Sequence, residues 1–204
     1  MPHTQHPPRS WRALSFSQDE GDVVNQSHLN LDAHTGTHID APRHFLPGAA
    51  TLEQLPLSVL TGHADVIAVP HDTNVTAAAL AGLAIPQDAE RLLFKTLNTE
   101  RWLMRQTPFA SDYVGLDSSA AAWLAAERPG VALVGIDYLS IGMLEDIVEA
   151  HKGLFRKGTV VVEGLDLSAA PPGRHHLTCL PLLLEGSDGA PARCILQLAG
   201  DTAA

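Results

Sequence analysis

The chain has 204 residues, of which 45% are hydrophobic, and a formal charge of −10; this is enough apolar material for one well-filled domain. The acidic balance, without a cluster of Lys and Arg, argues against nucleic acid or an anionic membrane as a partner. No apolar stretch approaches the roughly 20 residues of a membrane span, and the polar N-terminus is unlike a signal peptide, so we expect a cytoplasmic protein.

Seven segments rich in aliphatic or β-branched residues are predicted as strands: residues 27–31, 65–69, 91–96, 131–137, 159–162, 176–183 and 192–198. Three segments are predicted as helices: residues 76–82, 118–128 and 142–152. Many strands and few helices predict an α/β domain that is heavier in sheet than a doubly wound fold. No linker divides residues 1–204, so we expect a single domain.

Helix ends are predicted from their capping residues. Ser118 and Ser119 are the expected caps of the second helix. Gly153 is expected to stop the third helix, which places His151 near its end. A histidine in that position can be a metal ligand, or simply a cation favoured by the helix dipole.

The most informative segment reads His34-Thr-Gly-Thr-His38-Ile-Asp40-Ala-Pro-Arg-His44. Gly36, three β-branched residues and Pro42 disfavour a helix. A straight strand would hold His34 and Asp40 about 20 Å apart, whereas metal ligand atoms lie about 2.0–2.2 Å from one centre. The segment must therefore bend, which Gly36 tolerates, and we expect a strand that ends near Leu31 followed by a folded ligand loop.

The donor atoms of this segment suit an open metal site. Two imidazoles and a carboxylate, from His34, His38 and Asp40, are a ligand set of catalytic zinc or manganese centres that keep a position for water. His44 follows a rigid proline and is available as a base. Because the chain has 11 histidines, the alternative is that some of these rings lie at the surface or satisfy a buried hydrogen bond.

A second candidate ligand lies far downstream. Glu163 follows the β-branched run at residues 159–162 and precedes Gly164, which predicts a carboxylate at the end of a buried strand. Such a carboxylate needs a partner, because leaving it unpaired costs more than the strand gains. The alternative is an acid at the solvent end of the strand, hydrated or in a salt bridge.

The segment from His34 to Phe45 resembles the signature of the metal-dependent cyclase family, which includes bacterial kynurenine formamidase, isatin hydrolase and a dienelactone hydrolase. Further blocks similar to the family lie at residues 93–98, 113–116, 134–141, 162–165 and 179–182, and the similarity runs from about Gly21 to Leu198. The resemblance implies a swivelling β/β/α architecture with a mixed, sheet-rich core.

The resemblance also implies a site. One divalent ion, Zn²⁺ or Mn²⁺, is expected on His34, His38 and Asp40. A second ion, where present, is bridged by Asp40 and completed by His151 and Glu163, which gives one or two ions per chain. His44 matches the catalytic acid/base, and the expected partners are a small-molecule substrate and further copies of the chain, in a homodimer or larger homo-oligomer.

Three functions fit these residues. The first is hydrolysis of a small-molecule amide, lactam or lactone, with metal-activated water as nucleophile and His44 moving the proton. A particular case of this first function is hydrolysis of N-formylkynurenine, which is kept as a further alternative. The second is cyclisation or dehydration of an intermediate of specialised, polyketide-like metabolism. The third is a non-enzymatic metal-binding module, which would not need His44.

The sequence departs from the family pattern at two places that bear on which substrate the protein binds. The N-terminal segment, residues 1–20, is short, so the family's first strand and its pocket aromatic are expected to be shortened or missing, and Trp11 is not a substitute. Residues 138–140 read Tyr-Leu-Ser where tryptophan-pathway formamidases have Thr-Pro-Ser, which favours the broader cyclase branch.

The two cysteines carry little information at this level. Cys179 and Cys194 pair only if the fold brings them together, and two cysteines in a chain of this size do not indicate a disulfide framework.

Overall fold

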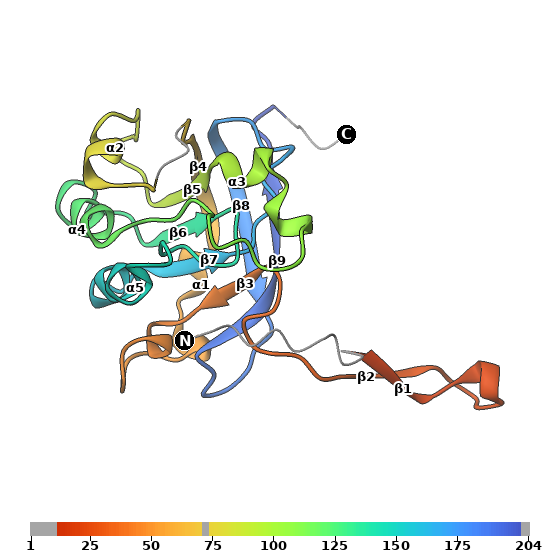
Figure 1. Ribbon diagram of the computed structural model, residues 1–204. Helices are drawn as coiled ribbons and strands as arrows, with labels where there is room; N and C mark the ends of the chain where they lie inside the picture. Colours follow the sequence, from red (N-terminus) through yellow and green to blue (C-terminus); the bar gives the residue numbers. More distant parts are fainter. Residues whose placement is uncertain (1–11, 71–73, 201–204) are drawn as a thin grey trace.

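A closed barrel of seven strands forms the body of the computed structural model, which describes residues 12–70 and 74–200 (Figure 1). The strand order is β3-β7-β6-β5-β4-β8-β9. Strands β4 to β7 are parallel to one another, whereas β8, β9 and β3 close the barrel with antiparallel pairs. The bounds are β3 His38–Asp40, β4 Thr61–Ala68, β5 Arg91–Lys95, β6 Leu133–Ile136, β7 Val160–Glu163, β8 Gly173–Pro181 and β9 Gly189–Gln197. The predicted α/β class with a mixed, sheet-rich core is confirmed.

The larger helices lie together on one side of the barrel (Figure 1). The helices are α1 Leu57–Leu60, α2 Ala77–Ala81, α3 Leu97–Glu100, α4 Ser118–Glu127 and α5 Ile147–Arg156, with 3-10 turns at Gln18–Glu20, Pro42–His44, Leu52–Gln54 and Leu103–Arg105. Helices α2, α4 and α5 correspond to the three that the sequence predicts.

Two apolar cores lie on the two faces of the same strands. Successive side chains of a strand point to opposite faces, so β7 sends Val160 and Val162 into the barrel interior and Val161 into the core beneath α4 and α5. By the same alternation, Ile39 of β3 points into the barrel. The polar side chains of His38, Asp40 and Glu163 therefore belong to the helix-covered face.

The ends of the two long helices differ from the sequence prediction. The cap of α4 is Asp117, whose carboxylate accepts from the amide of Ala120 at 2.8 Å, while the hydroxyl of Ser119 donates to Asp117. Gly153 does not stop α5. A Cβ at Gly153 would lie 2.8 Å from Cβ of Ala121, so this glycine allows α4 and α5 to pack closely, and α5 ends before Gly158, whose φ is 81°.

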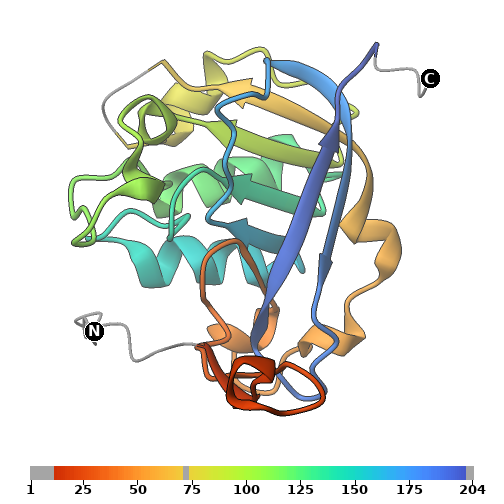
Figure 2. The ribbon, with the colours of Figure 1, turned by 90° about the vertical axis from the view of Figure 1, so that its right-hand side faces the viewer.

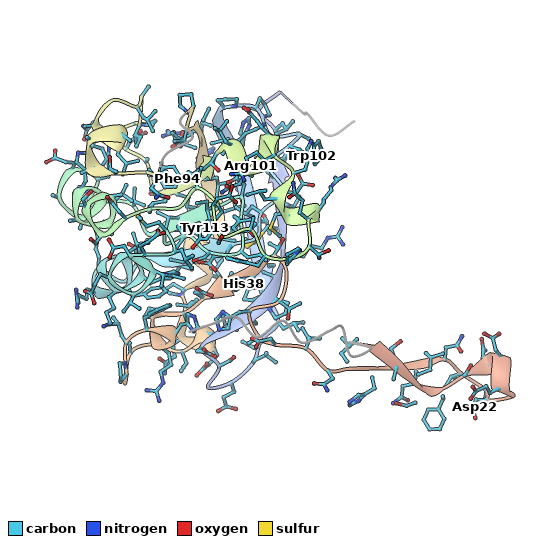
Figure 3. All side chains as sticks on the ribbon, viewed as in Figure 1. Asp22, His38, Phe94, Arg101, Trp102 and Tyr113 are labelled. Carbon is cyan, nitrogen blue, oxygen red and sulfur yellow. A yellow bond between two sulfur atoms is a disulfide. The ribbon has the colours of Figure 1, made fainter. Side chains whose placement is uncertain are left out.

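A two-stranded ribbon extends away from the barrel. It pairs β1 Arg12–Phe16 with β2 Gln26–Leu29 in antiparallel register, and Asp22 lies near its tip, far from His38 in the barrel (Figures 1 and 3). The expectation that the family's first strand is shortened or missing concerns the residues before Trp11, which lie with Trp11 outside the described residues. The predicted strand at 27–31 ends at Leu29 and is exposed throughout, because it pairs only with β1.

The long strands β8 and β9 lie side by side along the barrel (Figure 2). Their register places Cys179 opposite Cys194, and the two sulfur atoms form a disulfide. The sequence alone did not indicate this bond, because the pairing follows from the hairpin register. Within the described part of the chain, none of the helices is both long and apolar enough to span a bilayer.

Candidate metal centre

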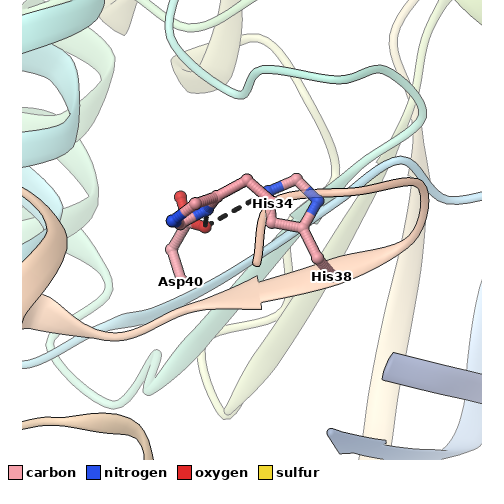
Figure 4. A group of neighbouring side chains, drawn as sticks. All are labelled: His34, His38 and Asp40. Carbon is pink, nitrogen blue, oxygen red and sulfur yellow. Dashed lines mark hydrogen bonds and ion pairs between the residues drawn. The ribbon is translucent and has the colours of Figure 1, made fainter. Parts of the chain in front are cut away.

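The segment that carries the first ligand candidates turns back on itself before it enters the barrel. Gly36 has a φ of 65°, a left-handed conformation that glycine adopts without steric cost. Upstream of this turn, Nδ1 of His34 comes to 2.8 Å from Oδ1 of Asp40 (Figure 4). The predicted bend at Gly36 is present, and it brings together two residues that a straight strand would keep apart.

The ligand loop is partly a strand, in contrast to the prediction. Residues His38–Asp40 form β3, which pairs with β7 on one side and β9 on the other. A strand of three residues that contains His and Asp has a weak strand signal in the sequence. Its neighbours on both sides supply the backbone hydrogen bonds, so tertiary pairing overrides the local preference.

The β3–β7 pairing sets His38 opposite Glu163. Nε2 of His38 lies 3.3 Å from Oε2 of Glu163 and 3.2 Å from Oδ1 of Asp40. Directly opposed residues of an antiparallel pair have neighbouring side chains on one face. Two carboxylates and an imidazole from distant parts of the sequence therefore converge on the helix-covered face of the sheet.

Helix α5 contributes the second imidazole to this cluster. Nε2 of His151 lies 3.0 Å from Oε1 of Glu163 and 3.9 Å from Oδ2 of Asp40. His151 is the fifth residue of a ten-residue helix, so the alternative that it serves as a cation at the helix C-terminus is wrong. The ring of Phe45 stacks on His151, with centroids 4.4 Å apart, and covers it with an apolar surface.

In His38 and His151, the hydrogen bond made by Nδ1 determines the protonation of Nε2, the ring nitrogen that faces the carboxylates. Nδ1 of His38 lies 2.9 Å from the carbonyl oxygen of Gly36, and Nδ1 of His151 lies 2.6 Å from that of Ile147. A carbonyl oxygen only accepts, so each Nδ1 carries the proton. Each neutral ring then directs the lone pair of Nε2 at buried carboxylates, an arrangement that requires a cation or a proton between them.

The burial and pKa values of the two carboxylates are consistent with a cation or a proton between them and the imidazoles. Asp40 and Glu163 are 1% and 4% exposed, and among the described residues their ion pairs are all with histidines. Burial raises the pKa of both carboxyl groups, and the charge of Asp40 raises that of Glu163 further, but hydrogen bonds from the histidines outweigh these effects and lower both pKa values.

The imidazoles shift in the opposite direction. Burial lowers the pKa of His34 and His38, but hydrogen bonds to carboxylates and the negative charge of Asp40 outweigh it and raise these pKa values to about 9 and about 10. The pKa of His151 is raised as well, because its hydrogen bond to Glu163 outweighs burial. Protons therefore occupy the spaces between imidazole and carboxylate that suit a divalent cation.

All five predicted ligand residues are brought together. Their donor atoms form two groups that share Asp40, and within each group the atoms lie within 4.8 Å of one another. One group contains His34, His38 and Asp40, and the other contains Asp40, His151 and Glu163. The donor chemistry of both groups, nitrogen and carboxylate oxygen, fits zinc or manganese.

His44 lies beside the two groups and belongs to neither. It ends the 3-10 turn Pro42–His44, and its ring centroid lies 4.0 Å from that of His34. Nδ1 of His44 lies 2.9 Å from Oδ2 of Asp188. A proton on Nδ1 leaves Nε2 of His44 free to accept another.

Asp188 is a site residue that the sequence analysis missed. It precedes β9, and its Oδ2 also lies 3.1 Å from Nε2 of His34. It stands 144 residues from His44, and a lone Asp before Gly in a loop reads as an ordinary turn. Only the pairing of β3 with β9 indicates that this turn reaches the cluster.

Comparisons with known proteins identify the family of the chain. The family model described as "Putative cyclase" matches residues 2–143. The chain is 42% identical to Cyclase-like protein 3 of Oryza sativa subsp. japonica over 188 residues, 90% of this chain and 69% of that protein. It is 35% identical to Kynurenine formamidase of Salinibacter ruber over 200 residues, 94% of this chain and 88% of that protein.

A solved structure has the same fold. It is described as a potential metal-dependent hydrolase with cyclase activity, and it superposes with a TM-score of 0.77 at 34% identity. The match covers 96% of this chain and 90% of that one. The resemblance stated from the sequence motifs is therefore confirmed at the level of family and fold.

The raised pKa values of His34 and His38 predict how the metal-free protein responds to pH. A group whose pKa is higher in the folded than in the unfolded chain stabilises the fold fully below its unfolded value and less as pH rises through its folded value. With an unfolded value of 6.5 and folded values of about 9 and 10, the chelated protein should lose thermal stability from pH 6.5 upward.

Thermal unfolding of chelated and Zn²⁺-supplemented protein between pH 6 and 9.5 measures this. The metal-supplemented protein should not show the same loss, because the cation replaces the protons. His38→Gln should remove part of the dependence, and the exposed control His63→Gln should leave it unchanged. A chelated protein whose melting temperature does not fall over this range contradicts the prediction.

Proposed function

The chain belongs to the cyclase family, and from this membership and the geometry we propose that it is a metal-dependent hydrolase that cleaves the C–N or C–O bond of a small-molecule amide, lactam or lactone. The observation that carries the proposal is the direction of two ring nitrogens: Nε2 of His38 and of His151 face the buried carboxylates of Asp40 and Glu163.

One or two ions per chain fit the donor groups. His34, His38 and Asp40 would hold one Zn²⁺ or Mn²⁺ ion, and Asp40, His151 and Glu163 would hold a second ion where it is present. When bound, a divalent cation supplies Lewis-acid chemistry, because it draws electron density from a substrate carbonyl and makes water more acidic. Hydrogen bonds to backbone groups restrict the motion of the His38, His151 and Glu163 side chains, which would hold the charge in place.

His44 moves the proton in this proposal. Its ring lies against that of His34, and His44 is in neither of the two groups that share Asp40, so Nε2 of His44 can reach a water beside the cluster. As the water oxygen bonds to the carbonyl carbon, Nε2 accepts the proton. When the C–N or C–O bond breaks, the same nitrogen returns the proton to the leaving atom, and the enzyme ends in its starting state.

A second candidate function is supported by the relatives. The identity to a cyclase-like protein, 42%, exceeds that to a kynurenine formamidase, 35%. Residue Tyr138, where the tryptophan-pathway formamidases differ, is buried and packs against Tyr113 and Phe109. Cyclisation or dehydration of a biosynthetic intermediate is therefore the alternative reaction, and N-formylkynurenine is the alternative substrate.

The assembly that we propose is a homodimer or larger homo-oligomer. The β1–β2 ribbon extends into solvent (Figure 1) with five large apolar side chains exposed: Leu14, Phe16, Val23, Val24 and Leu29. An isolated two-stranded ribbon is at best marginally stable in water, and exposed apolar patches of this kind mark interaction sites. We take a second copy of the chain as the partner of this ribbon, because other copies are present wherever the protein is made.

The location that we propose is the cytoplasm, as expected from the acidic composition of the sequence. Thiols are kept reduced in that compartment. The Cys179–Cys194 disulfide is thus the feature that counts against this location.

Two substitutions separate the role of base from the role of ligand. His44→Ala should lower turnover by roughly 10²–10⁴-fold while metal content stays unchanged, because His44 lies outside both ligand groups. Asp40→Asn should lose metal and activity together, because Asp40 is shared by both groups. Elemental analysis and rates on a panel of N-formylkynurenine, isatin and simple lactones measure both effects, with the exposed His176→Ala as control.

Different results would contradict the assignment of His44 as base and that of Asp40 as ligand. An active His44→Ala enzyme would show that another group carries the proton. Full metal content in Asp40→Asn would show that this carboxylate is not a ligand.

The reaction class is tested in ¹⁸O-labelled water. Hydrolysis places one labelled oxygen in the acid product, because water attacks the carbonyl carbon. Mass spectrometry of the product measures the label, and the unreacted substrate is the control for passive exchange. A product that lacks the label, or that has lost water, supports the cyclase or dehydratase alternative instead.

The ribbon is tested through the mass of the protein in solution. The double variant Phe16→Asp, Val24→Asp should shift the assembly to monomer, because it places charges in an apolar contact. Light scattering after size exclusion measures the mass, and Asp19→Ser on the same ribbon is the control. A monomeric native protein, or a double variant of native mass, would contradict the proposed contact.

A further inference from the structure

Asp188 contacts two histidines with different roles in the proposed reaction. Its Oδ2 lies 3.1 Å from Nε2 of His34, a ligand candidate, and 2.9 Å from Nδ1 of His44, the candidate base. The two imidazole rings lie against each other at a centroid distance of 4.0 Å and an interplanar angle of 31°. One carboxylate oxygen therefore joins the metal cluster to the proton carrier.

The backbone holds Asp188 in this position. Asp40 pairs with Gly189 in the β3–β9 register, and the amide of Ala41 donates to the carbonyl oxygen of Asp188 at 2.9 Å. A Cβ at Gly189 would lie 2.6 Å from Cε1 of His34. The absence of a side chain at Gly189 allows the chain to pass directly beside the imidazole, so the place of Asp188 is set by the same strand that carries Asp40.

The direction of both hydrogen bonds follows from elementary chemistry. An ionised carboxylate only accepts hydrogen bonds, so the ring nitrogens that face it are the protonated ones. His34 faces Asp40 through Nδ1 and Asp188 through Nε2, so without a metal ion both nitrogens carry a proton. If a cation replaces the proton on Nδ1, the hydrogen bond to Asp188 keeps the remaining proton on Nε2. His44 carries its proton on Nδ1, which leaves Nε2 to accept a proton from water.

We propose that Asp188 is a positioning residue that fixes the tautomers of His34 and His44 together, and so aligns a metal ligand and the base through one carboxylate. The inference rests on the proposed function, since it assigns these roles to the two histidines. Carboxylates that accept from the second nitrogen of a ligating histidine orient the ring and raise its basicity, and their loss costs about 10–100-fold in metal affinity or activity.

A competing possibility is that Asp188 is itself a ligand. The donor atoms of His34, His44 and Asp188 form a third group within 4.8 Å. The positioning role is favoured because Oδ2 lies at hydrogen-bond distance from both rings, so its acceptor capacity is used by the two N–H groups.

The test uses the full-length protein and the variants Asp188→Asn and Asp188→Ala. Asn keeps the shape but removes the charge, and its NH₂ group can donate, which stabilises the wrong tautomer. Glu185→Gln, an exposed change in the same loop, is the matched control. The readouts are Zn²⁺ affinity of the chelated protein, ¹⁵N NMR of the histidine rings, and kcat and KM at saturating Zn²⁺.

Both Asp188 variants should bind Zn²⁺ about 10–100-fold more weakly and show a similar fall in kcat with little change in KM. The ¹⁵N spectra should show His44 protonated on Nδ1 in the native protein and on a mixture of nitrogens in the variants. Glu185→Gln should behave as the native protein does.

Two results would overturn the inference. Native Zn²⁺ affinity and native ring tautomers in Asp188→Asn would show that Asp188 positions neither histidine. X-ray absorption that counts one oxygen ligand fewer in Asp188→Ala would make it a ligand instead. Failure of the proposed hydrolysis is distinguishable, because the affinity and NMR readouts need no turnover.

Discussion

The structure of the site depends on two carboxylates that are removed from water and form ion pairs with imidazoles. Asp40 and Glu163 lie at the helix-covered face of the barrel. Among the described residues, their ion pairs are all with histidines. Burying such charge is unfavourable unless it is paired. The protein balances it with groups that can exchange a proton for a cation, which couples the stability of the fold to metal binding.

The barrel supplies the rigidity that this arrangement needs. Strand β3 is only three residues long, but β7 and β9 bond to it on both sides, so His38 and Asp40 project from a fixed backbone. Helix α5 then delivers His151, whose outer nitrogen is held by a carbonyl oxygen of the helix itself. A site built on strands and a helix holds its ligand atoms more precisely than one built on loops alone.

Exposure increases across the cluster from the buried ligand candidates to His44, the base that we propose. The side chains of Asp40, His38 and His151 are at most 2% exposed, whereas those of His44 and Asp188 are 29% and 44% exposed. The buried side has the low dielectric that strengthens electrostatic interactions with a substrate. The open side holds the group that must exchange protons with water, so the two requirements of a hydrolytic site are met at opposite ends of one cluster.

The sequence by itself indicated the family, the mixed α/β class and five ligand candidates. The glycine, proline and spaced histidines of residues 34–44 predicted a bent metal-binding segment, and the family resemblance added His151 and Glu163 to the ligand set. Tertiary structure decided what depends on register between distant strands: that β3 is a strand, that His38 faces Glu163, that Cys179 meets Cys194 and that Asp188 reaches His44. A strand pairing contributes no local pattern to either partner, so the residues that it brings together are visible only once the chain has folded.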